Sequence, residues 1–289
     1  MDEHNLTLAQ IEAFRGHLLA EERAPGTVEK YQRDLRAFLR WLDGRAVTQE
    51  RAAEWKTELL ATSHAPVTVN SMVAALNGLF GFLGWDDCRV KFLRIQRRAF
   101  RDQSRELTRA EYTHLVGTAR DHGKERLALL METVCGTGIR VSEVPYITVE
   151  TARVGRAEIA LKGKIRVILL PDKLCRKLLK YARKHKIASG EIFITRSGRR
   201  MSRKQIWAEM KQLCTLSGVC PAKVYPHNLH HLFARTFYRA CRDIARLADV
   251  LGHSSMETTR IYLVTTGVEH LRQMEKLGLV IVGRNCYFD

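Results

Sequence analysis

The stretch AEIALKGKIRVILLP, residues 157–171, decides the fold class, because here the hydrophobic period changes from that of a helix to that of a strand. Apolar residues alternate with other residues on both sides of a Lys-Gly-Lys turn, at Ile159, Leu161, Ile165, Val167 and Leu169. Alternation around a glycine-containing turn predicts a β-hairpin. Apolar residues elsewhere recur mainly at helical intervals. The sequence therefore predicts a mainly α-helical protein with a small β-sheet.

The first hundred residues have the pattern of a small helical domain. A first helix, in the stretch LTLAQIEAFRGHLL over residues 6–19, begins with Thr7 and Gln10 in capping-box spacing. A second follows the turn residues Pro25, Gly26 and Thr27, with Thr27 as its cap, and another covers residues 67–85. The stretch RIQRRAFRDQSRE that follows is basic and nearly free of apolar residues. We predict a helical domain over residues 1–93, a basic linker over 94–105 and a second domain over 106–289.

Charge is the strongest bulk property of the chain. The sequence contains 48 Lys and Arg against 31 Asp and Glu, a net charge of +17. The excess is uneven, with a net charge of +1 up to Arg98 and +16 from Ala99 onward. A surface of this sign concentrates polyanions, so nucleic acid is the first candidate partner and an anionic membrane the second.

Several classes of protein are disfavoured by composition. No apolar run approaches the roughly 20 residues that span a bilayer, and the start MDEHN lacks the layout of a signal peptide. Seven cysteines without a CxxC pair fit reduced thiols better than a disulfide framework or a zinc ribbon. We expect a soluble cytoplasmic protein with no membrane partner.

Four short motifs follow one another in the second domain: TGIRVSEV, LKGKIRV, HNLHHLF and LGHSSMETTRIY. Each alone is a weak signal, since Arg140 could be a surface arginine and Lys162 an ordinary turn residue. In this order and spacing, with 26 positions from His227 to His253 and nine more to Tyr262, they resemble the motifs of the tyrosine recombinases. That family includes the phage integrases, the Xer resolvases and Cre. The resemblance runs from Thr7 to about Leu279, and implies a helical core-binding, SAM-like domain followed by a catalytic domain.

The resemblance implies a role for each motif residue. Tyr262 would be the nucleophile, forming a 3′-phosphotyrosyl bond and releasing a 5′-hydroxyl that later attacks a partner strand through a Holliday junction. Arg140 would clamp the scissile phosphate with its planar fork. His227 would accept or relay the tyrosine proton, and His253 would hydrogen-bond the phosphate. Lys162, at the hairpin tip, would protonate the leaving oxygen.

Two further positions accompany this set. Lys164 is the alternative to Lys162 as the proton donor, and otherwise a DNA contact. Glu143 lies about one helical turn after Arg140 and would orient its guanidinium.

His230 departs from the family pattern, which has a second phosphate-clamping arginine at this position. Histidine is shorter, offers at most two donors and is only partly charged near its usual pKa of about 6.5. The loss of one preorganised donor typically costs on the order of 10²–10³ in rate. We therefore expect DNA binding and synapsis to persist and cleavage to be slow. The histidine is either a deliberate substitution that traps a DNA complex or a natural variant.

A metal site at His227, His230 and His231 is the alternative reading of PHNLHHLF, residues 226–233, because positions i and i+4 share a helix face. No acidic ligand cluster accompanies these histidines, and the family cleaves DNA without a metal. We therefore expect no metal and no cofactor, and a supporting role for His231.

Basic residues outside the motifs are candidate DNA contacts, although a charged row is often only a solvated surface. They lie in the second predicted helix, at Lys30, Arg33, Arg36 and Arg40, and in the linker, at Arg97, Arg98 and Arg101. Near the end of the chain, about residues 265–279, apolar positions share one face. This segment resembles the family's exchanged helix, which docks on a neighbouring subunit, and docking on its own domain is the alternative.

The sequence as a whole predicts a site-specific DNA recombinase for integration, excision or resolution. Its DNA would carry inverted half-sites, each site bound by a homodimer, with two dimers forming a tetramer. We expect a bacterial, nucleoid-associated protein, with a phage or mobile element as one source. A non-catalytic DNA-binding accessory subunit is the main alternative, and a type IB topoisomerase the third. Covalent attachment through Tyr262 separates the first two, and tetramer formation on DNA separates a recombinase from a topoisomerase.

Overall fold

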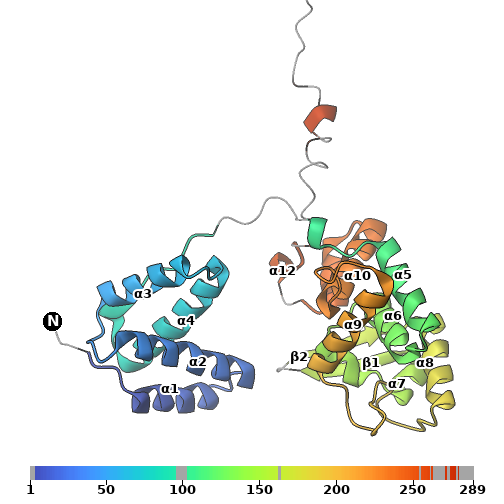
Figure 1. The fold of residues 1–289 in the computed structure, drawn as a ribbon, viewed down its shortest axis with the longest axis horizontal. Coiled ribbons are helices and arrows are strands. Elements are labelled where there is room, and N and C mark those ends of the chain that lie inside the picture. Colours follow the sequence, from blue (N-terminus) through green and yellow to red (C-terminus); the bar gives the residue numbers. More distant parts are fainter. Residues whose placement is uncertain are drawn as a thin grey trace, which may run out of the picture. The chain divides into compact units, whose positions relative to one another are not determined.

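The computed structural model describes residues 4–95, 103–161, 164–253, 255–260, 262, 271, 274–277 and 279. The chain divides into two compact units, Met1–Arg97 and Arg98–Asp289, each with its own hydrophobic core (Figure 1). The division falls inside the stretch 94–105 that the sequence predicts as a linker; the exact domain limits stay a prediction.

The part of the N-terminal unit that the structure describes, residues 4–95, contains four α-helices. They are α1 (Leu8–Ala20), α2 (Pro25–Leu42), α3 (Gln49–Ala61) and α4 (Pro66–Leu83), followed by the short 3₁₀ helix η1 (Asp86–Cys88). The predicted capping box of Thr7 and Gln10 is present at the start of α1. The predicted Thr27 cap is wrong: α2 begins at Pro25, so Thr27 lies inside its first turn. Proline at the first helical position fixes the backbone angle for entry without a side-chain cap.

Helix α4 is long and apolar enough to cross a membrane, judged by its length and composition alone. The sequence analysis predicts no membrane-spanning segment. Its residues Val69, Val73, Leu76 and Leu79 are fully buried, in one core with residues of α1, α2 and α3. A helix whose apolar face is covered by its own domain is typical of a globular core, so α4 gives only weak support for a membrane span.

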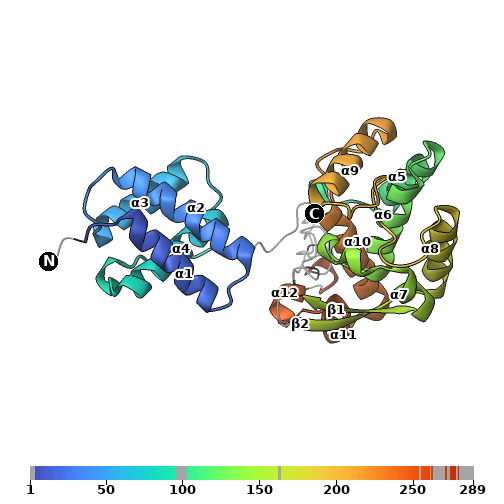
Figure 2. The same ribbon diagram turned by 90° about the horizontal axis from the view of Figure 1, so that it is seen from below.

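Among its described residues, the C-terminal unit is mainly helical and contains one β-hairpin (Figure 2). Helix α6 lies at its centre and packs against α5, α8, α9 and α10. The elements in chain order are η2 (Gln103–Arg105), α5 (Arg109–Asp121), α6 (Glu125–Thr137), η3 (Val141–Tyr146), α7 (Val149–Val154), β1 (Arg156–Leu161), β2 (Lys164–Leu169), α8 (Asp172–Lys184), α9 (Arg203–Ser217), α10 (Pro226–Cys241), α11 (Ile244–Leu251) and α12 (Met256–Arg260). The predicted class, mainly α with a small β-sheet, is confirmed.

The predicted hairpin is also present, as antiparallel strands whose register pairs Ile159 with Arg166 and Leu161 with Lys164. The alternating apolar residues of β2 face solvent, however: Ile165, Val167 and Leu169 are all at least half exposed. The face turned toward the core carries Ala157, Ile159, Ile168 and, between them, Arg166. Arg166 faces inward because it has polar partners inside the unit, which are described below.

Candidate active site

Segments far apart in sequence bring four histidines and a tyrosine together in the C-terminal unit. His227, His230 and His231 lie on α10, His253 follows α11, and Tyr262 follows α12. The Tyr262 ring centroid lies 6.0 Å from that of His230, 5.1 Å from that of His231 and 6.1 Å from that of His253. The third and fourth motifs therefore form one cluster.

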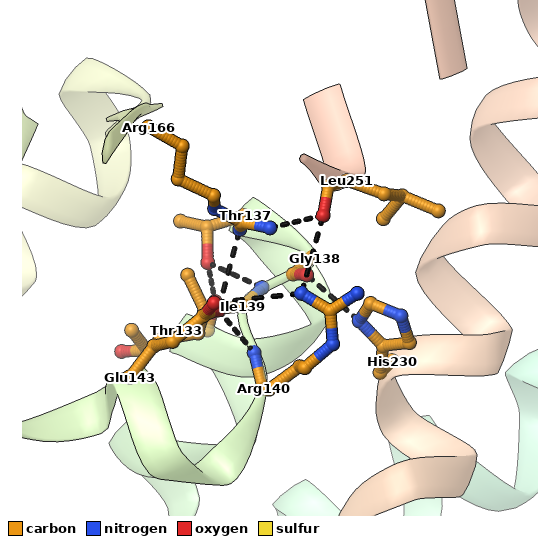
Figure 3. A network of polar contacts seen from close by, with 9 residues as sticks. All are labelled: Thr133, Thr137, Gly138, Ile139, Arg140, Glu143, Arg166, His230 and Leu251. Atoms are coloured by element: carbon orange, nitrogen blue, oxygen red, sulfur yellow. Dashed lines mark hydrogen bonds and ion pairs between the residues drawn. The ribbon is translucent and has the colours of Figure 1, made fainter. Parts of the chain in front are cut away.

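Arg140 enters the site from a tight turn at the end of α6. Gly138 closes that helix with a φ of +68°, and a Cβ there would lie 2.4 Å from ring carbons of Phe233. Only glycine combines this left-handed conformation with such a close approach. Thr137 holds the turn by donating to the carbonyl of Thr133 at 2.6 Å (Figure 3). The chain then reverses and Arg140 becomes the N-cap of η3.

Glu143 is the immediate partner of Arg140. Its carboxylate accepts the backbone N–H of Arg140 at 2.7 Å and lies 3.5 Å from the guanidinium Nη1. The same Nη1 donates to the carbonyl of Leu251 at 3.3 Å. Glu143 is 4% exposed, whereas the Arg140 side chain stays partly exposed. This arrangement restrains the guanidinium while leaving part of it open to a ligand.

Arg166 is a member of this network that the sequence analysis did not single out. Its guanidinium donates to the carbonyl of Leu251 and lies 3.3 Å from Glu143 (Figure 3). The position of Arg166 between Ile165 and Val167 could have indicated its role. Successive side chains of a strand face opposite sides, so Arg166 must lie on the face opposite to these two residues. The apolar residues were the stronger pattern, and they gave the wrong buried face.

His230 is buried deep in the site, with 1% of its surface exposed. Its Nδ1 lies 2.7 Å from the carbonyl oxygen of Gly138, which can only accept, so Nδ1 carries the proton. Burial lowers the pKa of His230 to about 3, and the nearby charge of Arg140 acts in the same direction. The ring is therefore neutral at neutral pH, and Nε2, which has no hydrogen-bond partner among the described residues, presents a lone pair.

His227 and His231 flank this ring. His227 lies at the surface, and partial desolvation together with the Arg140 charge lowers its pKa. The His227 ring centroid is 4.2 Å from that of His231 and 5.6 Å from that of His230. Among the described residues, these histidines do not place three ligand atoms within 4.8 Å of one another; the group that does is His4, Asp87 and Cys88 in the N-terminal unit.

His253 and Tyr262 complete the cluster. Nδ1 of His253 lies 2.8 Å from Oγ1 of Thr259, a fully buried residue of α12, and this contact fixes the orientation of the ring. The rings of His253 and Tyr262 are nearly parallel, with an interplanar angle of 15°. Tyr262 is 5% exposed and packs with Leu247 and Leu251 of α11. The Tyr262 ring thus lies among the candidate catalytic side chains, and the residue is largely shielded from solvent.

The other predicted site residues lie apart from this cluster or outside the described residues. Four of them lie outside the described residues: Lys162, Arg97, Arg98 and Arg101. Lys164 is described only by its backbone pairing with Leu161.

In α2, Lys30 and Arg33 pair with the buried Asp34, and Arg36 lies 2.6 Å from Glu12. Arg33, Arg36, Arg40 and Arg15 line a groove of about 610 Å³ between α1 and α2.

Arg235, the arginine of α10 nearest to His230 in sequence, is engaged elsewhere. It donates to the carbonyl of Leu107 at 2.8 Å and pairs with Glu106 at 3.2 Å. It therefore points away from the Arg140 cluster, as the spacing of five residues predicts.

Known proteins resemble this chain over both units. Residues 105–266 match the phage integrase family, and residues 11–87 match the phage integrase N-terminal SAM-like domain. Tyrosine recombinase XerA of Thermococcus kodakarensis is 29% identical over 281 residues, covering 94% of this chain and 95% of the relative. Tyrosine recombinase XerC of Roseiflexus castenholzii is 30% identical over 278 residues, covering 88% of each.

Solved structures agree on the fold. A lambda integrase dimer bound to a COC′ core site gives a TM-score of 0.71 at 16% identity, covering 90% of this chain and 77% of that one. The Tn1549 transposon integrase in complex with transposon right end DNA gives 0.68 at 16% identity, covering 93% and 99%. With both sequence units matched and a relative at 30% identity, this chain belongs to the phage integrase family of tyrosine recombinases, with an N-terminal SAM-like domain.

Proposed function

We propose that this protein is a site-specific DNA recombinase that cleaves and rejoins DNA through a covalent bond to Tyr262. The observation that carries the proposal is the convergence of Tyr262 with His230, His231 and His253, beside Arg140, from separate segments of one unit. A hydroxyl nucleophile, imidazoles and a restrained guanidinium are the groups that phosphodiester transfer needs. The names of the relatives, tyrosine recombinases XerA and XerC, support the same reaction.

The proposed reaction exchanges one phosphoester for another. The Tyr262 oxygen attacks phosphorus while His227 takes the phenolic proton, and the bond from phosphorus to the 5′ oxygen breaks. The leaving oxygen takes its proton from Lys162, with Lys164 as the alternative donor. Arg140 and His253 stabilise the charge on the non-bridging oxygens. The attacking 5′-hydroxyl of a partner strand reverses these steps, so strands are exchanged without a cofactor.

The burial of Tyr262 adds a condition to this scheme. A residue that is 5% exposed cannot reach a duplex, so we propose that Tyr262 becomes exposed before it attacks. Binding of DNA to the basic C-terminal unit is the event that we propose drives this exposure. The protein alone would then show little reactivity at Tyr262.

His230 cannot replace a phosphate-clamping arginine in this site. It is neutral, its only N–H is directed at the carbonyl of Gly138, and Nε2 offers a lone pair where a phosphate needs a donor. We propose that cleavage is slower than with arginine by on the order of 10²–10³, while DNA binding is retained. The same observation favours the second candidate function, a non-catalytic DNA-binding accessory subunit.

The proposed partner is double-stranded DNA with inverted half-sites, bound by a homodimer, with two dimers joined in a tetramer. Support for exchange of the C-terminal segment comes from Leu271, Met274, Leu277 and Leu279, which are each at least 59% exposed. An apolar row of this kind is suited to dock on a second copy. We propose a cytoplasmic site of action on bacterial nucleoid or mobile-element DNA.

The function can be tested on DNA that the protein itself selects. A randomised oligonucleotide pool is enriched for binding, and the selected inverted repeat is prepared as a nicked duplex that traps the covalent complex. The recombinase proposal expects a slow covalent complex that Tyr262→Phe abolishes and His230→Arg accelerates. Binding with no covalent complex for either the parent chain or His230→Arg would instead establish the accessory subunit. Equal rates for the parent and His230→Arg would refute the proposed effect of His230.

A further inference from the structure

Arg166 is the charged residue that β2 turns toward the core. Ile165 and Val167, its neighbours along the strand, are both at least half exposed, whereas the Arg166 side chain is 12% exposed. Burying a guanidinium is costly unless its charge and its donors find partners. A strand that exposes three large apolar side chains in order to bury an arginine needs a compensating contact.

That contact is with the two groups that also hold Arg140. Arg166 donates through Nη1 to the carbonyl of Leu251, and Arg140 donates to the same oxygen at 3.3 Å. The Glu143 carboxylate lies 3.3 Å from Nη2 of Arg166 and 3.5 Å from Nη1 of Arg140. Figure 3 shows the two guanidiniums approaching the same carbonyl and the same carboxylate. The shared partners couple the positions of the two side chains.

The charges of the network do not cancel. Two guanidiniums share one carboxylate, so the group carries a net charge of +1 beside neutral His230. Burial lowers the pKa of Arg166, and Arg140 acts in the same direction while Glu143 opposes it. Arginine remains charged under such conditions because its guanidinium does not lose a proton in proteins. An unbalanced positive charge that is held in place favours the approach of a phosphate.

Arg166 also touches the turn that leads to His253. Gly252 closes α11 with a φ of +62°, and a Cβ there would lie 2.4 Å from Cδ of Arg166. Leu251 supplies one of the last carbonyls of α11, a group that a helix leaves without an internal partner and that a cation stabilises. The side chain of Arg166 therefore links the hairpin, η3 and the end of α11.

We propose that Arg166 is a positioning residue of the recombination reaction, which holds Glu143 and the Leu251 carbonyl so that Arg140 meets the scissile phosphate. This inference rests on the proposed function. Arg166 acts through Arg140 and does not itself touch the phosphate. Misplacement of a catalytic group by about 1 Å can cost on the order of 10² in rate, so we expect Arg166→Met to slow covalent-complex formation about 10- to 100-fold.

A double-mutant comparison tests this role on the nicked duplex described above, in the His230→Arg background if the parent is too slow to measure. Because Arg166 acts through Arg140, the double variant Arg140→Met with Arg166→Met should be no slower than Arg140→Met alone. Arg166→Lys, which keeps a charge but not the fork, should recover part of the loss. Independent, multiplicative losses would show direct contact with the phosphate and overturn the proposal, as would a normal rate for Arg166→Met.

The control is Arg156→Met, which removes an exposed arginine from β1 of the same sheet. It should leave the cleavage rate unchanged after correction for DNA affinity. Urea unfolding of each variant identifies any loss that comes from unfolding at the assay temperature.

A second measurement does not depend on activity. In protein labelled with ¹⁵N-arginine, the side-chain N–H signals of Arg140, assigned by their loss in Arg140→Met, should exchange slowly with water. They should broaden or vanish in Arg166→Met and persist in Arg156→Met. Persistence in Arg166→Met would overturn the proposal. If neither the parent chain nor His230→Arg forms a covalent complex, the proposed function is contradicted. The NMR comparison still decides in that case whether Arg166 orders Arg140.

Discussion

Acidification should destabilise the folded protein through His230, and the size of the effect follows from its environment. The ring is 1% exposed and burial lowers its pKa to about 3, whereas an unfolded chain has a histidine pKa of about 6.5. Between these values the unfolded chain binds one more proton than the folded chain. Stability is therefore fully present above the unfolded pKa and is lost as the pH falls toward the folded pKa.

The magnitude at about pH 5 can be worked from these two values. About pH 5 is about 1.5 units below the pKa of histidine in the unfolded chain, so this histidine is almost fully protonated there. In the folded chain His230 stays neutral at the same pH. One unit corresponds to about 1.4 kcal/mol, so the free energy of unfolding should fall by about 2 kcal/mol between about pH 8 and pH 5 through this residue alone.

The assay compares the parent chain with His230→Asn by urea unfolding at both pH values. Asparagine can still donate to the carbonyl of Gly138 but does not titrate. Other titrating groups, including His227, whose pKa is also lowered, are common to both proteins and cancel in the difference. The advantage of the parent over the variant should therefore shrink by about 2 kcal/mol on acidification. A constant advantage, or one that grows at pH 5, would refute the neutral, buried state of His230.

Two other predictions concern the turn of the site and the DNA. In urea unfolding, Gly138→Ala should destabilise the fold by about 1–3 kcal/mol more than Gly123→Ala. Both glycines have φ near +68°, but a Cβ at Gly138 would lie 2.4 Å from Phe233, whereas a Cβ at Gly123 would have nothing within 4 Å. Equal losses would mean that Phe233 moves away freely. DNA affinity should fall by about 10³–10⁵ between about 50 and 200 mM salt if 6–10 phosphates are contacted, as a titration of fluorescent duplex would measure, and a flat response would contradict phosphate contact through the basic C-terminal unit.

Local pattern was sufficient for much of the fold. The capping box at Thr7 and the two antiparallel strands of the hairpin each depend on neighbouring residues, and each is present. The Thr27 cap failed because Pro25 already supplies a helix start, which is a competition between two local signals.

Contacts between distant segments were beyond local pattern. The buried face of β2 is set by Arg166 reaching Glu143 and Leu251, which lie 23 and 85 positions away in sequence. The motif spacing did bring His230, His253 and Tyr262 together, but the protonation of His230 depends on its burial and on the carbonyl of Gly138. Neither the burial of His230 nor its contact with the Gly138 carbonyl can be predicted from the residues next to it in sequence.

Whether Tyr262 carries the cleaved strand is decided most directly by identifying the modified residue. The trapped covalent complex is digested with nuclease and protease, and the nucleotide-bearing peptide is sequenced by mass spectrometry. We predict a nucleotide joined through a phosphodiester to Tyr262, and none in the Tyr262→Phe variant. A nucleotide on any other residue, or a covalent complex that survives Tyr262→Phe, would contradict the mechanism.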